Sequence, residues 1–134
     1  MNGQPREVSR SAALAMQGMI AGEHGGAGRL RSPGALESAL ATVGELVAFG
    51  EQDSIELAAA LANAILRDPP FADGNLPVAI ALAGVFLELN GWRLAAPEAE
   101  VAAATRALSA QEMDRAAFAE WLRGACVSAE RKRA

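Results

Sequence analysis

The amino-acid sequence predicts an all-α fold: a compact bundle of about six helices around one buried central helix. Three observations support this prediction. Apolar residues recur at steps of three and four along most of the 134 residues, which is the period of an amphipathic helix. The hydrophobic fraction is 51%, and much of it is alanine, which suits closely packed helices. The alternating pattern of a β-strand is almost absent.

The first two helices are separated by a glycine-rich break. The expected inward face of the first helix consists of Val8, Ala12, Ala15 and Met19. Glycines at 22, 25, 26 and 28 end that helix. Ser32 followed by Pro33 is a start signal, because a hydroxyl caps the first turn and proline is tolerated there. The second stripe, which Gly50 closes, consists of Leu36, Leu40, Val43 and Val47.

The next two helices flank a turn. Asp53 and Glu56 have capping-box spacing and predict a start. The stripe that follows consists of Leu57, Leu61 and Ile65. This helix stops at Asp68, because two prolines follow it. After a turn at 71–75, the segment 76–87 has no polar face. We therefore expect it to be the central helix, buried on nearly all sides.

The C-terminal part predicts two more helices. Asn90-Gly91 is a helix-end signal, and 92–94 is expected to be a brief extended piece. Pro97 opens a helix whose inward residues are Val101, Ala104 and Leu108. Asp114 caps the last helix, whose inward residues are Phe118, Trp121, Leu122 and Ala125. We expect a single domain over 1–134, with a core of about 8–126 and a basic tail over 127–134.

Composition argues against several classes of protein. The formal net charge of −4 gives no support to nucleic-acid binding, and the basic cluster at 131–133 is expected to be solvated. The longest apolar run, 76–87, is shorter than the roughly 18 residues that a membrane span needs. Residues 1–10 lack the apolar run of a signal peptide, so a cytoplasmic location is expected. The one cysteine, Cys126, is expected to be a packed or half-exposed thiol.

One short stretch carries residues that suit chemistry. Asp73-Gly74-Asn75 is a turn that feeds a helix N-terminus. A helix N-terminus offers free N–H groups to an anion, and a glycine lets the backbone approach a phosphate. Asp73 beside it would suit a magnesium ion that bridges phosphate oxygens. The alternative is a plain turn without a ligand.

This stretch also carries a resemblance to a known family. Residues 69–77, Pro-Pro-Phe-Ala-Asp-Gly-Asn-Leu-Pro, are similar to the Fic/Doc (death-on-curing) signature His-Pro-Phe-x-Asp/Glu-Gly-Asn-Lys-Arg. The segments 24–28 and 32–39 resemble the Gly-Gly loop and the next helix of Doc-type proteins. The segments 86–92 and 119–122 resemble the end of the central helix and the closing segment. The resemblance covers roughly residues 14 to 123.

The resemblance implies a fold and a chemistry. Fic/Doc proteins transfer a phosphoryl or nucleotidyl group from a nucleoside triphosphate to a protein hydroxyl. The Doc branch is a kinase toxin restrained by an antitoxin peptide. Carried over by position, Asp73 matches the magnesium-holding acid. Gly74 and Asn75 match the phosphate-cradling turn, and Phe71 matches an aromatic that packs the loop against the core.

Three positions depart from the signature. Pro69 stands where the family has its general-base histidine, so the sequence provides no catalytic residue there. Leu76 stands at the lysine position and Pro77 at the phosphate-clamping arginine position. A positioned general base typically accelerates the chemical step by about 10²–10⁴-fold. A charge-assisted hydrogen bond contributes about 1.5–3 kcal/mol, so the combined deficit is on the order of 10³-fold or more. Asp68 and His24 are the candidates for a replacement base.

Three hypotheses follow. The first is a degenerate, non-catalytic Doc-like domain that binds a protein: an antitoxin-like peptide, a homologue or the family's target. The second is an active transferase toxin whose base comes from elsewhere. The third is a module that binds magnesium and a nucleoside triphosphate through Asp73, Gly74 and Asn75 without turnover. The first is preferred, with no cofactor bound. The sequence does not give the oligomeric state.

Overall fold

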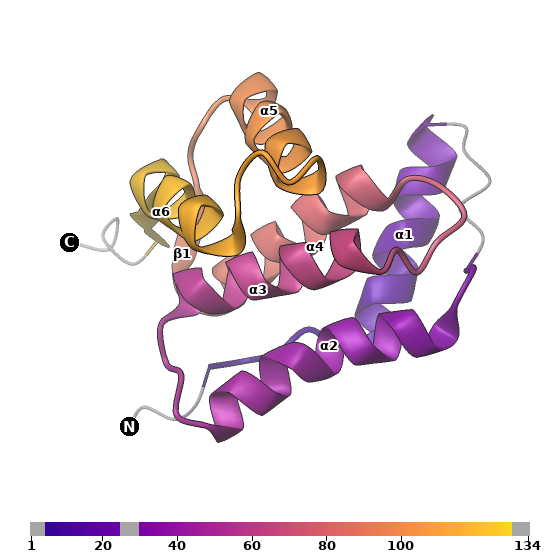
Figure 1. Ribbon diagram of the computed structural model, residues 1–134, viewed down its shortest axis with the longest axis horizontal. Coiled ribbons are helices and arrows are strands. Elements are labelled where there is room, and N and C mark those ends of the chain that lie inside the picture. The colour runs from indigo at the N-terminus through magenta and orange to yellow at the C-terminus, as the bar shows by residue number, and fades with distance from the viewer. Residues whose placement is uncertain (1–4, 25–29, 130–134) are drawn as a thin grey trace.

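The computed structural model describes residues 5–24 and 30–129, with residues 20–24 described by their backbone alone. These residues form six helices and two short strands (Figure 1). In chain order they are α1 (Arg10–His24), α2 (Pro33–Ala48), α3 (Ser54–Arg67), α4 (Asn75–Leu89), β1 (Trp92–Leu94), α5 (Glu98–Ser109), α6 (Arg115–Ala125) and β2 (Cys126–Ser128). The predicted all-α fold class is confirmed.

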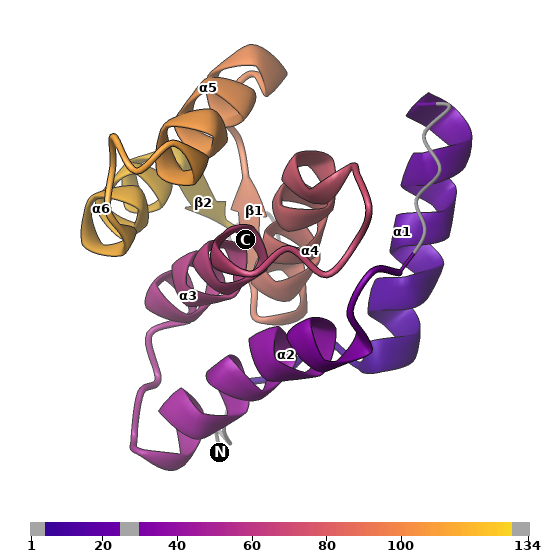
Figure 2. The same ribbon diagram turned by 45° about the vertical axis from the view of Figure 1, so that its right-hand side comes forward.

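Helices α3 and α4 form the centre of the molecule. Figures 1 and 2 show α1 and α2 on one side of this pair and α5 and α6 on the other. Helix α3 packs against α4 and also contacts α2, α5 and α6. Its buried residues include every member of the predicted stripe, Leu57, Leu61 and Ile65. The largest fully buried side chains also include Phe71, Phe86, Leu108 and Leu122, so one core joins the motif loop, α4, α5 and α6.

Helix α4 is central, but it is not buried on nearly all sides as expected. Its inward residues Val78, Leu82 and Phe86 are buried. A second face, with Pro77, Ala81 and Val85 at steps of four, is only half-buried. The cause is geometric, because one groove separates this face from α5 and another separates it from α1, so neither helix closes over it. The most completely buried helix is α3, which has more buried residues than α4.

Three predicted helix starts are confirmed by their capping bonds. The Ser32 hydroxyl accepts a hydrogen bond from the Ala35 N–H at 3.1 Å. The Asp53 carboxylate accepts from the Ile55 N–H at 3.0 Å, and the Asp114 carboxylate from the Ala117 N–H at 2.8 Å. Each side chain supplies an acceptor to a first-turn N–H that has no partner within the helix.

The reciprocal half of the capping box at Asp53 is not formed. The Asp53 N–H donates to Glu51 Oε2 at 3.0 Å, in place of the expected Glu56. Glu56 instead pairs with Arg123 of α6, Nη2 to Oε2 at 3.3 Å. Arg123 also reaches Asp53 Oδ2 at 3.0 Å. Glu56 therefore serves the packing of α6 against the start of α3, a tertiary contact that local spacing does not reveal.

The predicted inward face of α1 is wrong. Val8 is buried, but it precedes the helix, and Ala12, Ala15 and Met19 are exposed. Among the residues of α1 whose side chains are described, the buried positions are instead Ala13 and Gln17. Alanines occur on several faces of this helix, so spacing alone does not select the one that packs. The helix runs to His24, two residues beyond the first glycine that was expected to end it. The glycines at 25, 26 and 28 lie outside the described residues.

The extended piece expected at 92–94 is confirmed as β1. It pairs antiparallel with β2, in the register Trp92 with Ser128 and Leu94 with Cys126. The pairing continues beyond both ends, because the Ala95 N–H donates to the Ala125 carbonyl and the Ala129 N–H to the Gly91 carbonyl. The sequence did not predict β2, which includes the first two residues of the expected basic tail. Residues 130–134 of that tail lie outside the described part of the chain.

The helix-end signal at Asn90-Gly91 has a tertiary role as well. The Asn90 amide donates to the carbonyl of Phe86, in the last turn of α4, at 2.8 Å. It also bonds Arg6 in both directions, at 2.8 and 2.9 Å. One side chain thus ends α4 and fixes the N-terminal segment against it. Within the described residues, no helix is long and apolar enough to cross a membrane.

Candidate functional site

The signature-like loop connects α3 to α4 and is anchored in the core. Its aromatic residue, Phe71, is 1% exposed and belongs to the main hydrophobic cluster. The loop begins at Asp68, the C-cap of α3, and ends at Gly74, the N-cap of α4. The three residues Asp73, Gly74 and Asn75 therefore lie together at the N-terminus of α4.

The Asn75 side chain closes the loop on itself. Its Oδ1 accepts from the Phe71 N–H at 3.1 Å, and its Nδ2 donates to the Phe71 carbonyl at 2.9 Å. The carboxamide thus satisfies both backbone groups of one residue, as an extended strand neighbour would. These bonds commit the Asn75 side chain to the shape of the turn.

Gly74 is explained by its backbone conformation. Its φ is +76°, in the left-handed region that glycine adopts without strain. A Cβ at this position would have no atom within 4 Å, so the space beside it is open. Asp73, one residue earlier, is exposed. The turn thus presents a carboxylate at the edge of a helix N-terminus.

Arg31 holds this loop from across the fold, and sequence reasoning missed it. Its Nε donates to the Pro69 carbonyl at 2.8 Å, and its Nη2 donates to the same oxygen. Nη2 also lies 3.2 Å from Asp68 Oδ1. The residue at the family's histidine position therefore has its carbonyl capped by a guanidinium. An arginine just before a helix cap carries no signal in the sequence that would reveal a partner 37 residues away.

Backbone contacts strengthen the same junction. The N–H groups of Arg31 and Ser32 both donate to the Pro70 carbonyl, at 2.7 and 2.9 Å. Leu30 and Phe71 form an isolated antiparallel bridge. These backbone hydrogen bonds thus join the loop before α2 to the loop before α4. Ser32, which caps α2, is part of this junction.

The candidate replacement bases differ in what the structure says of them. Asp68 is exposed, ends α3 and is ion-paired with Arg31. The backbone of His24 ends α1, but its side chain lies outside the described residues. Cys126 is half-buried as expected, and burial raises the pKa of its thiol.

The residues present fit a magnesium–triphosphate group only at Asp73. Magnesium in such sites takes one or two carboxylates together with phosphate oxygens and waters, and cations balance the phosphates. Asp68 is paired with Arg31, and Leu76 and Pro77 bring no charge. Pro77, the third residue of α4, also has no N–H to offer. Among the described residues, no three His, Cys, Asp or Glu side chains are grouped to hold a metal.

The comparisons with known proteins agree with the position of this loop. The model of the Fic/DOC family matches residues 7–87, which span α1 to nearly the end of α4 and include the whole signature-like stretch. The resemblance suggested for 88–123 lies beyond that match and stays a prediction. The comparison with curated proteins gave no match. The family match covers more than half of the chain, and the protein belongs to the Fic/DOC family.

Proposed function

We propose that this protein is a degenerate Fic/DOC domain that does not catalyse group transfer and acts by binding a protein partner. One observation carries the proposal. The loop that should present the family's charged groups presents Pro69, Leu76 and Pro77 instead. The Asn75 side chain is used to hold the loop through Phe71, and Arg31, from the loop before α2, bonds the Pro69 carbonyl.

The loss at these positions is large enough to remove useful catalysis. Without a positioned base the family reaction slows by about 10²–10⁴-fold. The missing phosphate contacts cost about 1.5–3 kcal/mol each. Asp68 would have to give up its pairing with Arg31 to act as a base. The packing around the loop is retained, so the fold persists without the chemistry.

A protein partner is supported by the family, whose members are generally associated with toxin–antitoxin pairs. The partner in this proposal is an antitoxin-like peptide, an active homologue, or the family's target bound without modification. We place this binding of a protein partner in the cytoplasm, where a Doc-like protein would encounter its target.

The first test is calorimetric titration with magnesium and ATP, GTP, UTP or CTP in turn. We expect no saturable heat at millimolar nucleotide. A variant carrying Pro69→His, Leu76→Lys and Pro77→Arg provides a control in which the signature charges are restored. Saturable binding to the natural chain that Asp73→Ala abolishes would contradict the proposal and favour a nucleotide-binding module.

The second test looks for turnover directly. The chain is incubated in a cytosolic lysate with nucleotide labelled on the α- or the γ-phosphate. We expect no labelled protein beyond the background without the chain. Labelling that His24→Ala or Asp68→Asn removes would show an active transferase with a substitute base, and the proposal would fail.

A further inference from the structure

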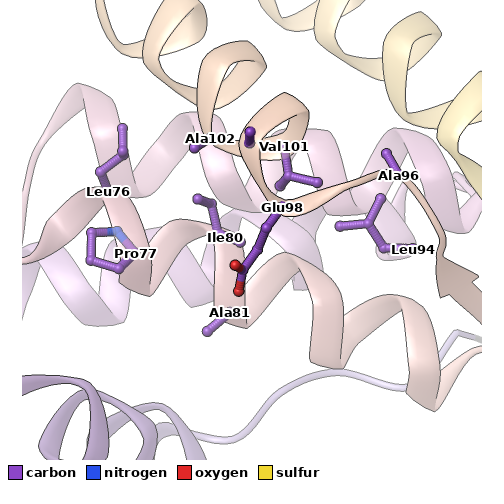
Figure 3. A pocket seen from close by; sticks show the side chains of 10 residues that line it. Leu76, Pro77, Ile80, Ala81, Leu94, Ala96, Glu98, Val101 and Ala102 are labelled. Carbon is purple, nitrogen blue, oxygen red and sulfur yellow. The ribbon is translucent and has the colours of Figure 1, made fainter. Parts of the chain in front are cut away.

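A cavity lies beside the signature-like loop, between the N-terminal half of α4, the end of β1 and the start of α5. Its volume is about 830 Å³, within the range of about 300–1,000 Å³ typical of ligand pockets. Leu76 and Pro77 form one end of it (Figure 3). The other apolar side chains in its lining include Ile80, Leu94 and Val101.

The departures from the family signature change the character of this cavity. Lysine and arginine at positions 76 and 77 would bring two positive charges to its wall. Leu76 and Pro77 make the same wall apolar. Glu98 is then the one charged residue in the lining. The net charge of the lining residues is therefore −1, where the signature residues would have made it +1.

Glu98 is placed to meet a cation. Figure 3 shows its side chain extending from the first turn of α5 toward Ile80 and Ala81, so its carboxylate lies over an apolar floor. Among the described residues Glu98 forms no ion pair, so its carboxylate is available to a cation of a partner.

These features complement a segment that is apolar and basic at once. An apolar side chain would fill the space between Ile80, Leu94 and Val101, and a lysine or arginine beside it would reach Glu98. An amphipathic helix carries both groups one turn apart. The formal net charge of −4 also attracts a basic partner from a distance.

We propose that the cavity between α4 and α5 docks a basic amphipathic segment of a protein partner, with Glu98 holding its cation. This rests on the proposed protein-binding function and names the surface and the chemistry of the partner. The partner segment would cover part of the half-exposed face of α4, because Pro77 and Ala81 belong both to that face and to the cavity.

The test uses the full chain and a fluorescein-labelled 14-residue peptide in which leucine and lysine alternate in the order of an amphipathic helix. Binding of the peptide is measured by fluorescence anisotropy at physiological salt. We expect saturable binding to one site. The same peptide with glutamate in place of lysine should not bind. Glu98→Gln should weaken binding about three- to fivefold, as expected for loss of an exposed ion pair. Leu76→Lys, which adds a cation to the wall, should weaken it at least as much.

The matched control is Glu88→Gln. Glu88 lines a similar apolar groove of about 630 Å³ between α4 and α1, next to the cavity that contains Glu98. The charge change is the same, so an effect of net charge alone would appear equally in both variants. We expect less than a twofold change for Glu88→Gln. A thermal melt of each variant shows whether it is folded, and the exposed Glu98 is suited to a substitution that leaves the fold intact.

Several outcomes would overturn the inference. Equal effects of Glu98→Gln and Glu88→Gln would show that only net charge is sensed, and equal binding of the glutamate peptide would remove the role of the cation. If the leucine–lysine peptide did not bind, the cavity would not be a docking site for a basic amphipathic segment. Self-association in sedimentation velocity that the peptide reverses would assign the cavity to a second copy. Nucleotide binding or transfer would refute the proposed function and leave the peptide result standing, so the two failures are distinguishable.

Discussion

At the scale of single residues, the signature-like loop is maintained by side chains that bond its backbone. Asn75 alone satisfies the N–H and the carbonyl of Phe71. Phe71 in turn is fully buried, so its backbone groups have little access to water. A buried backbone group without a partner is costly, which makes Asn75 a structural requirement whether or not a ligand binds beside it.

Asn75→Ala should therefore destabilise the fold. Two hydrogen bonds are lost and two buried groups are left unsatisfied, so we expect a decrease of about 2 kcal/mol in the free energy of unfolding. Urea denaturation followed by circular dichroism measures it. Asn63→Ala in the middle of α3 is the matched control and should change stability by at most about 0.7 kcal/mol. Equal effects of the two variants would show that the Asn75 bonds contribute nothing.

Cys126 gives a pH-dependent prediction. Burial raises the pKa of its thiol in the folded chain. The folded state therefore holds the proton more tightly than the unfolded state. Its stabilising contribution is complete below the unfolded pKa and is lost as the pH rises through the folded pKa. Because the chain has one cysteine, the rate of iodoacetamide alkylation against pH reports this group alone.

We expect the midpoint of that alkylation profile to lie at higher pH in the folded chain than in the same chain unfolded in urea. The comparison uses identical reagent and temperature, and the urea sample supplies the reference pKa. A folded midpoint at or below the unfolded one would mean that the thiol is solvated or faces a positive charge.

At the scale of elements, side chains from one helix complete the ends of others. Arg67, the last residue of α3, donates from Nη2 to the carbonyls of Leu108 and Ser109, both at 2.9 Å. These carbonyls belong to the last turn of α5, where a helix has no internal donors and a partial negative charge. The end of α3 thus caps the end of α5.

Arg67→Gln should loosen this end of α5. We expect a loss of about 1–2 kcal/mol in the free energy of unfolding, together with faster amide exchange in the residues after Leu108. Arg106→Gln is the control, because Arg106 lies in the same last turn of α5 and is exposed. That variant should lose at most about 1 kcal/mol, from the helix dipole alone. A larger loss for Arg106→Gln than for Arg67→Gln would contradict the capping role.

Whether the sequence predicted a structural feature also depends on how far apart along the chain the interacting residues lie. Helix starts at Ser32, Asp53 and Asp114 were predicted correctly, because a cap and its first turn are neighbours in sequence. The face of α1 was predicted wrongly, since its alanines do not distinguish one side from another. Strand β2 is three residues long and depends on a partner more than 30 residues away. Local pattern has no access to such a pairing.

The same division between local and tertiary features holds for the candidate site. The turn Asp73-Gly74-Asn75 was located at a helix N-terminus from its sequence, and it lies there. The contact of Arg31 with Pro69 joins residues 38 apart. The cavity beside Leu76 exists only once α5 has packed near α4. These features come from tertiary packing, which the local sequence pattern does not reveal.

At the scale of the whole molecule, the family match and the core do not coincide. The match ends at residue 87, but the inner face of α3 is covered by α6, with Phe118 and Leu122 buried, and Leu108 of α5 completes the core. We therefore expect helices α5 and α6 to unfold as one cooperative unit with α1–α4. Without them α3 would expose a large apolar surface to water.

A chain ending at residue 91 should therefore lose cooperative folding. We expect a broad urea transition, retained helical signal and binding of a hydrophobic dye, because α3 and α4 keep local helical preference while the core residues they share with α6 are missing. The control removes only residues 130–134 and should keep a sharp transition. The decisive measurement compares near- and far-ultraviolet circular dichroism through the same titration. Coincident, steep transitions in the shorter chain would show that the matched segment folds alone, and that α5 and α6 are an addition to a complete domain.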